Sequence, residues 1–295
     1  MSDIKECFVS RFAKHGKIVS LDFSQLEIWY LAFITQDKQL LADAASGRDL
    51  HRMRAAELFD IAEADVTKIQ RTLAKELSFE LQYGAGATSM AGGHKLPKEV
   101  CQKFIDNYYA RYPRVKEWQG KLIAEVKGLR QSTTKLSKKG HPLGVSKYRS
   151  ITGRIYTFNE YDAPEWMSVY TDKRTGEKKP RKDPVFTAIS PTEVKNHPIQ
   201  GGGSDLVAIT RGRLMRQMLK HDWYMEQVLP IMTVHDSIEF DCVTEYVDPA
   251  CEVIQYVVDR LPVYFEKEFG VELNVKFPVE IKVGPNWMQM EKRHA

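Results

Sequence analysis

Residues 17–27 read KIVSLDFSQLE, an apolar run that ends at an acidic residue and leads into a polar segment. The run predicts a strand over 17–23. Ser24 and Glu27 have the spacing of a capping box, which predicts that a helix begins there. A carboxylate at such a junction is well placed for chemistry, so Asp22 is the first candidate catalytic residue.

Residues 231–241 read IMTVHDSIEFD and predict two short strands around a tight turn at 235–237. If these strands share a sheet with 17–23, Asp22 and Asp236 meet at its edge. Two carboxylates can hold Mg²⁺, which takes its other ligands from water and substrate phosphates, and two such ions can promote in-line phosphoryl transfer. The alternative is that each aspartate only serves its own turn or cap.

A third candidate site lies in the predicted helix over 66–82, where Arg71, Lys75 and Phe79 are spaced by four residues. This spacing places them in one stripe about 12 Å long. Two cations followed by an aromatic ring match a triphosphate followed by a sugar and base, and Lys75 can also donate a proton. Tyr83 continues the stripe. The alternative is an ordinary amphipathic helix with exposed cations and a core phenylalanine.

The composition of the 295 residues is that of a folded globular protein, with 43% hydrophobic and 28% charged residues. No apolar run approaches the roughly 18 residues of a membrane span, and residues 1–17 have no secretory h-region. The four cysteines have no C-x-x-C spacing, so neither a zinc site nor a disulfide framework is expected. We therefore expect a cytoplasmic protein without membrane contact.

The order of predicted elements indicates an α+β fold with one domain inserted into another. Helices are expected over 40–45, 50–59, 66–82, 97–109 and 113–126, then loops and short strands over 128–190, helices over 203–220 and 249–269, and a final strand over 279–283. The outer pieces can form one sheet, with about 33–190 inserted.

Positive charge gathers in residues 131–183, which carry twelve basic and six acidic residues, whereas the whole chain has a net charge of only +4. A local basic segment suits a phosphate backbone. A solvated, lysine-rich loop explains the charge equally well.

Together these stretches resemble the polymerase motifs of the family A DNA polymerases, the bacterial DNA polymerase I and phage replicative class. Asp22-Phe-Ser-Gln-Leu-Glu27 is similar to D-[YF]-S-Q-x-E. The second motif, R-x₃-K-x₃-F-x₃-Y-G, is matched from Arg71 to Gly84, and Val234-His-Asp236 resembles V-H-D-E. Secondary matches stand at 49–51, 111–113, 196–201 and 284–287.

The resemblance implies an antiparallel-sheet palm formed by 1–32 and 190–295, and a mostly helical fingers domain over 33–189 that includes the basic insertion at about 131–183. It implies DNA-templated DNA synthesis from dNTPs on primer-template DNA. Relatives carry a thumb and usually an exonuclease domain before the first motif, and neither is expected in this chain. We therefore expect one half of a split, phage-type polymerase, with a second polypeptide that supplies the thumb and also, as an option, a 3′–5′ exonuclease.

The resemblance also implies two Mg²⁺ ions, with Mn²⁺ as a substitute, held by Asp22, Asp236 and the backbone carbonyl of Phe23. Lys75 would protonate the leaving pyrophosphate, and Glu27 would exclude a 2′-hydroxyl. The implied dNTP contacts are His51, Arg71, Lys75, Phe79, Tyr83, Glu27 and Gln25. The implied primer and template contacts are Tyr83, Asn196, Gln200 and His235.

Several alternatives stay open. Asn196 and Gln200 could instead cap a helix at Gly201, and His235 could be a plain turn residue. Ser237 stands where the motif has Glu, which predicts tuning of the site rather than loss, and Lys195 stands where the family often has an arginine. An RNA polymerase with related palm motifs and a non-catalytic nucleic-acid-binding subunit are the competing functions.

Overall fold

The computed structural model describes residues 2–293. Its contacts divide the chain into two compact units, one formed by the chain up to Ile34 together with the part from Gln200 onward, the other by Thr35–Ile199. Both units combine helices with antiparallel strands, which confirms the expected α+β class. Within residues 2–293, no helix is both long and apolar enough to cross a membrane.

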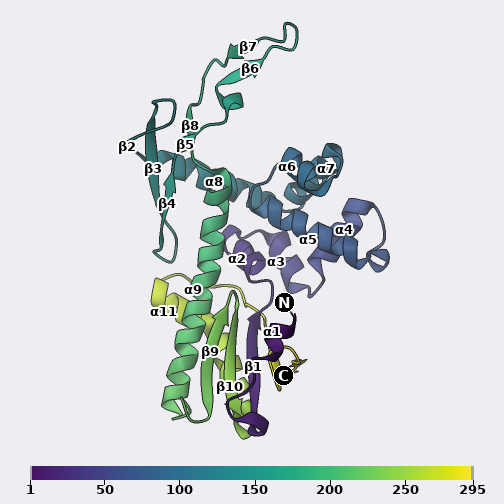
Figure 1. Cartoon of the computed structure of the whole chain (residues 1–295), viewed down its shortest axis with the longest axis vertical. Helices are drawn as coiled ribbons and strands as arrows, with labels where there is room; N and C mark the ends of the chain where they lie inside the picture. Colours follow the sequence, from purple (N-terminus) through teal and green to yellow (C-terminus); the bar gives the residue numbers. More distant parts are fainter. Residues whose placement is uncertain (1, 294–295) are drawn as a thin grey trace. The chain divides into compact units, whose positions relative to one another are not determined.

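The first unit is built on a five-stranded antiparallel sheet in the order β12-β11-β1-β10-β9. Figure 1 labels three of its neighbouring strands, β9, β10 and β1. The strands of this sheet are β1 (Gly16–Phe23), β9 (Val228–Val234), β10 (Ser237–Val243), β11 (Val279–Gly284) and β12 (Glu291–Lys292). The predicted first strand, hairpin and last strand are therefore confirmed. They pair with one another, with β1 between β10 and β11.

Alternate residues of β1 and β10 serve the two faces of this sheet. Val19 and Leu21 share one face with Ile238 and Phe240, and all four are buried. The amphipathic helix α10 (Val247–Asp259) packs against both strands. The residues between them are polar, so the opposite face of the same two strands carries hydroxyl and carboxyl groups.

Two helices of the first unit differ from the sequence prediction. The helix predicted over 249–269 is divided into α10 and α11 (Leu261–Phe269), because Pro262 lacks the N–H that a continuous helix requires. The helix after the first strand, α2 (Leu26–Thr35), starts one residue later than the capping box requires, since Gln25 has a left-handed φ of 55°. The chain begins with α1 (Ser2–Glu6), which was not predicted.

The second unit opens with six helices, five of which the sequence predicted within a few residues. They are α3 (Lys38–Ala45), α4 (Leu50–Phe59), α5 (Lys68–Gln82), α6 (Ala87–His94), α7 (Lys98–Arg111) and α8 (Pro113–Gly128). Asp37, Asp49 and Thr67 cap α3, α4 and α5 through side-chain oxygens. The missed helix α6 has two consecutive glycines, which give it a poor intrinsic helix propensity.

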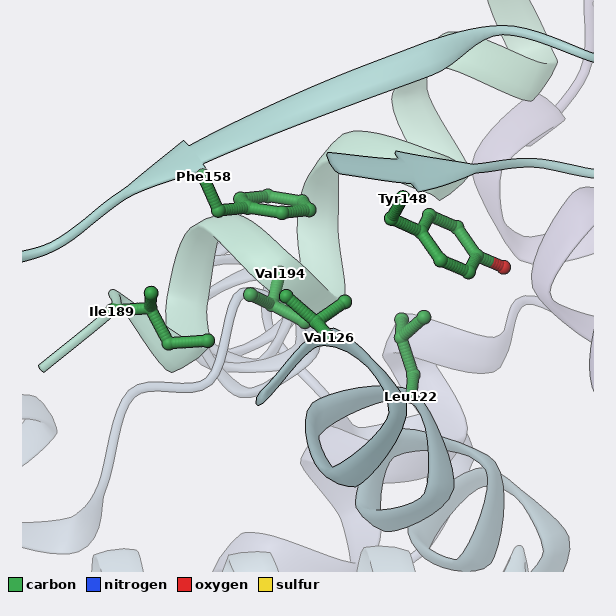
Figure 2. Packing of buried hydrophobic residues seen from close by; sticks show 6 residues of the cluster. All are labelled: Leu122, Val126, Tyr148, Phe158, Ile189 and Val194. Atoms are coloured by element: carbon green, nitrogen blue, oxygen red, sulfur yellow. The ribbon is translucent and has the colours of Figure 1, made fainter. Parts of the chain in front are cut away.

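Short strands follow, as predicted for 128–190. A three-stranded sheet contains β2 (Arg130–Leu136), β3 (Pro142–Arg149) and β4 (Ile155–Asn159), and two small ladders pair β5 (Tyr161–Asp162) with β8 (Thr187–Ala188) and β6 (Val169–Thr171) with β7 (Lys178–Pro180). Figure 2 shows how this segment is anchored by buried side chains: Leu122 and Val126 of α8, Tyr148 of β3, Phe158 of β4, Ile189, and Val194.

Val194 belongs to α9 (Pro191–Lys220), which starts twelve residues before the predicted helix at 203. Pro198 and the glycines at 201–203 are normally helix-breaking signals. Here two of the glycines serve packing instead. A Cβ on Gly202 would lie 1.9 Å from the Tyr30 ring, and one on Gly203 would lie 3.2 Å from Leu26. These glycines therefore allow α2 to approach α9 closely.

Candidate active site

The strand register brings Asp22 and Asp236 together at one end of the sheet. Asp22 pairs with Ser237, the residue that follows Asp236, and the backbone N–H of Phe23 donates to the carbonyl oxygen of Asp236 at 3.2 Å. Asp236 lies in a two-residue turn between β9 and β10, where His235 has a φ of 55°. Two aspartates separated by more than 200 residues in sequence thus share one sheet edge.

Negative charge accumulates around this pair. Burial raises the pKa of Asp22, and the carboxylates of Asp236 and of Glu280, its partner on β11, raise it further. Lys282 opposes this effect and forms an ion pair with Glu280 at 2.6 Å. A cation at this edge would relieve the repulsion between the carboxylates.

The donor set at this edge fits Mg²⁺. Mg²⁺ is bound through one or two carboxylates and keeps waters or substrate phosphates as its other ligands. Asp22 and Asp236 provide those two carboxylates, and the repulsion that raises the pKa of Asp22 is the condition that a divalent cation neutralises. In the described part of the chain, no three or more His, Cys, Asp or Glu side chains form a group that could hold an ion by themselves. Any ion here would therefore take its remaining ligands from water or from substrate oxygens.

A cleft of about 360 Å³ opens beside Asp236 within the first unit. Four of the eight residues that line it were predicted site residues, namely Glu27, Gln200, His235 and Asp236. The others are Leu26, Gly203, Ser204 and Val207. The volume is typical of a ligand pocket. Gln25, also predicted to contact a nucleotide, is exposed at the turn before α2.

In the second unit, α5 presents the predicted stripe of side chains. The ammonium of Lys75 lies 5.6 Å from the centre of the Phe79 ring, and Phe79 stacks on Tyr83 with 6.2 Å between ring centres. His51 of α4 lies alongside, 5.8 Å from Phe79. Two cations and a row of rings are therefore arranged along one helix, as the spacing predicted.

His51 and Arg71 have neighbours that the sequence did not reveal. His51 is only 6% exposed, and burial together with Arg54 and Arg71 lowers its pKa to about 4. Its imidazole is therefore neutral near pH 7. Arg71 forms an ion pair with Asp49, the N-cap of α4. Burial opposes ionisation of Asp49, but the hydrogen bonds from Arg71 and from the backbone of Arg52 hold its pKa below the usual value.

Asn196 and Lys195 lie inside α9 rather than at its end, so the alternative that Asn196 and Gln200 cap a helix at Gly201 is wrong. The Oδ1 atom of Asn196 is buried and has no hydrogen-bond partner among the described residues. Lys195 lies against Gly84, where a Cβ would be 3.3 Å from the lysine Cδ, and burial lowers the pKa of this lysine. Both residues thus have polar groups in partly buried positions.

One buried acid beside the aspartate pair was not predicted. Glu239 of β10 is 0% exposed, and its Oε1 accepts hydrogen bonds from the hydroxyls of Ser20 at 3.0 Å and Ser237 at 2.8 Å. Burial raises its pKa and the charge of Asp22 raises it further, although hydrogen bonds from Ser237, Ser20 and Trp287 oppose this shift. The apolar–polar alternation over 238–241 places Glu239 on the face opposite Ile238 and Phe240, so its burial could not be predicted from the sequence.

Comparisons with known proteins identify the family to which the chain belongs. Residues 1–289 match the model of DNA polymerase family A. The DNA polymerase of Bacillus phage SP01 is 28% identical over 97% of the chain and 27% of its own length, and DNA polymerase I of Pseudomonas aeruginosa is 28% identical over 96% of the chain and 26% of its own length. The chain thus spans about a quarter of the length of these relatives.

A solved structure shares the fold. It is the POL domain of Pol1 from M. smegmatis in complex with DNA primer-template and dNTP, with a TM-score of 0.68 and 19% identity over 97% of the chain and 42% of that structure's chain. The family model covers nearly every residue of the sequence. The protein is therefore a member of DNA polymerase family A.

Proposed function

We propose that this chain catalyses template-directed addition of dNTPs to the 3′-hydroxyl of a primer, with its first unit as the palm and its second unit as the fingers. The observation that carries the proposal is the cleft lined by Glu27, Gln200, His235 and Asp236, next to the edge where Asp22 meets Asp236. A catalytic carboxylate pair, a candidate sugar gate and two candidate primer contacts converge there within one unit.

In this proposal Asp22, Asp236 and the backbone carbonyl of Phe23 hold two divalent ions, Mg²⁺ or Mn²⁺. When bound, such ions stabilise charge on the attacking and leaving oxygens of phosphoryl transfer. The excess negative charge at the sheet edge supports this assignment, because it favours cations over other ligands.

The stripe on α5 binds the nucleotide. Arg71 and Lys75 contact the triphosphate, and Lys75 gives a proton to the leaving pyrophosphate oxygen. Phe79 packs on the deoxyribose, while Tyr83 stacks near the template base. His51 contributes as a neutral hydrogen-bonding group, since its pKa of about 4 leaves it uncharged. To bind the triphosphate, Arg71 must either release Asp49 or bind Asp49 and the phosphate oxygens at the same time.

Primer and template contacts involve Asn196, Gln200 and His235. The unpaired, buried Oδ1 of Asn196 supports a role in binding, because a buried polar atom without a partner is costly unless a ligand satisfies it. Gln25 is a further candidate nucleotide contact.

The basic insertion contacts the DNA backbone. Its net charge of +6 lies entirely in residues 131–159, which contain six basic and no acidic residues, while the basic and acidic residues of 160–183 balance. Lys147 and Arg149 are exposed on β3, and Tyr148 between them is buried, so the sheet turns its basic side chains outward. Exposed cations that outnumber the acids around them suit a phosphate backbone.

A primer-extension assay with dNTPs or rNTPs tests the proposed substrate class. Mg²⁺-dependent incorporation of the dNTP that the template specifies is expected, with rNTPs used poorly because Glu27 obstructs the 2′-hydroxyl. Efficient use of rNTPs would assign the chain to RNA synthesis. DNA binding without incorporation of either would assign it a non-catalytic role.

A second polypeptide that supplies a thumb, with or without a 3′–5′ exonuclease, stays a prediction. It is tested by mixing the chain with candidate products of neighbouring genes and measuring co-elution and extension length. Co-elution with longer extension products would support a split enzyme. Independent elution, with processive synthesis by this chain alone, would exclude one.

A further inference from the structure

Glu239 is a buried carboxyl group with hydroxyl partners on two strands. Its Oε1 accepts a hydrogen bond from Ser20 of β1 at 3.0 Å and another from Ser237 of its own strand at 2.8 Å. The side chain has no exposed surface. Acidic side chains are almost never fully buried unless something compensates, so this position calls for a specific explanation.

The two serines stand next to the candidate catalytic aspartates. Ser237 directly follows Asp236, and Ser20 precedes Asp22 by two residues, on the same face of β1. The carboxyl group of Glu239 therefore links, through two hydrogen bonds, the strand end that carries Asp22 and the strand end next to Asp236.

The carboxyl group of Glu239 also lies close to the position at which the family motif has a glutamate. The motif V-H-D-E has a glutamate at the position of Ser237. Glu239 lies two residues further along the same face of β10, and its side chain reaches back to the Ser237 hydroxyl.

We propose that Glu239 is a positioning residue of the catalytic centre, which fixes the relative placement of Asp22 and Asp236 through the hydroxyls of Ser20 and Ser237. The inference rests on the proposed polymerase function, since it assigns Glu239 a part in that reaction. It predicts that loss of the two hydrogen bonds affects the turnover rate and ion binding rather than nucleotide affinity.

If Glu239 only stabilised the fold, its loss would lower stability and leave the turnover rate unchanged. A second buried acid on the same strand serves as a matched control. Asp241 is the next acid on the same face of β10, is 4% exposed, and accepts a hydrogen bond from the backbone N–H of Arg11 at 3.1 Å. It is further from the aspartate pair along the strand. Asp241→Asn should therefore lower stability without changing the turnover rate of the folded protein.

The test compares Glu239→Met, Glu239→Gln and Asp241→Asn by single-nucleotide incorporation and thermal melting. Each lost hydrogen bond is worth about fivefold to tenfold, so Glu239→Met, which removes two of them, should lower kcat about 25- to 100-fold, with the KM for dNTP changed less than about twofold. Gln should keep kcat within about threefold. The amide N–H of the glutamine can donate a hydrogen bond to the Ser237 hydroxyl oxygen. The Ser237 hydroxyl can then donate its own hydrogen to the carbonyl oxygen of Val234, which lies 3.1 Å away.

A second readout needs no DNA or nucleotide. Mn²⁺ binding, followed by the electron paramagnetic resonance signal of the free ion, should weaken by a similar factor in Glu239→Met and stay near wild type in Glu239→Gln and Asp241→Asn. If the wild-type chain incorporates no nucleotide, the proposed function fails, and this binding series alone decides the inference.

The inference is overturned if Glu239→Met keeps wild-type kcat and Mn²⁺ affinity, if Gln is as impaired as Met, or if Asp241→Asn is impaired equally. Should Glu239→Met fail to fold, Ser20→Ala and Ser237→Ala remove one hydrogen bond each and keep the carboxyl group. Each should then lower kcat about fivefold, and wild-type rates in both would overturn the inference.

Discussion

Replacement of Asp22 by Asn should stabilise the metal-free protein and abolish its stabilisation by Mg²⁺. Asp22 lies opposite Glu280 and beside Asp236, and burial and these two carboxylates raise its pKa. Asn keeps the size and polarity of the side chain and removes the charge. The variant therefore loses the repulsion that the wild-type protein bears when no cation is bound.

The expected gain follows from the number of like-charged neighbours. Charged cross-strand pairs are worth about 0.2–1 kcal/mol, and like charges directly opposite are destabilising. On this scale, repulsion from Glu280 across the strands and from Asp236 in the adjacent turn costs about 1 kcal/mol together. Attraction between Asp22 and Lys282 offsets part of this, and Asp22 is only half-buried. We expect a gain of about 0.5–1 kcal/mol in the free energy of unfolding, or a Tm increase of about 1–2 °C.

Mg²⁺ should reverse the order of stability. An ion at ten times its Kd adds about 1.4 kcal/mol to a protein that binds it, and only the wild type keeps both carboxylates. Differential scanning calorimetry in EDTA and in saturating Mg²⁺ measures both effects. The higher Tm of the variant in EDTA should also approach that of the wild type as pH falls through the raised pKa of Asp22, because Asp22 of the wild type then becomes protonated and loses its charge.

Two results would refute this reasoning. A lower Tm of Asp22→Asn than of wild type in EDTA would show that the charge of Asp22 is not under repulsion. An equal Mg²⁺-dependent gain in both proteins would show that the ion binds elsewhere.

The remaining predictions concern the nucleotide contacts. Arg71→Ala should raise the KM for dNTP about 10- to 100-fold, the value of a charge-assisted hydrogen bond, in steady-state extension kinetics. Glu27→Ala should raise rNTP incorporation relative to dNTP about tenfold or more, measured by competition on one template. His51 has a folded-state pKa of about 4, below its ordinary 6.5, so the unfolded chain binds the proton first. Stability should fall relative to His51→Gln by up to about 3 kcal/mol as pH drops from about 6.5 to about 4, measured by denaturant titration.

Sequence patterns could predict the elements that carry the site because those elements follow local rules. The apolar strand that ends at Asp22 and the hairpin around Asp236 are both present in the structure, and β1 pairs with β10. The four-residue spacing of Arg71, Lys75 and Phe79 likewise gives a real stripe on α5. The strand, the hairpin and the stripe depend only on short-range periodicity, whereas the pairing of β1 with β10 could be stated from the sequence only as a condition.

Features that depend on long-range packing were missed. The start of α9 was placed too late because Pro198 and the glycines at 201–203 signal a break, whereas in the fold two of these glycines allow a close approach to Tyr30 and Leu26. The pairing of Arg71 with Asp49 required knowledge of which helices lie side by side. Glu239 was missed for the same reason, since its partner Ser20 is more than 200 residues away.

The catalytic role of the aspartate pair is tested most directly by the rate of single-nucleotide incorporation by wild type and Asp236→Ala, together with DNA binding at fixed salt. We expect Mg²⁺-dependent incorporation of the templated dNTP by wild type. We also expect a loss of at least about 10³-fold in Asp236→Ala, with DNA binding nearly unchanged. An Asp236→Ala variant that incorporates nucleotide at the wild-type rate would contradict this role.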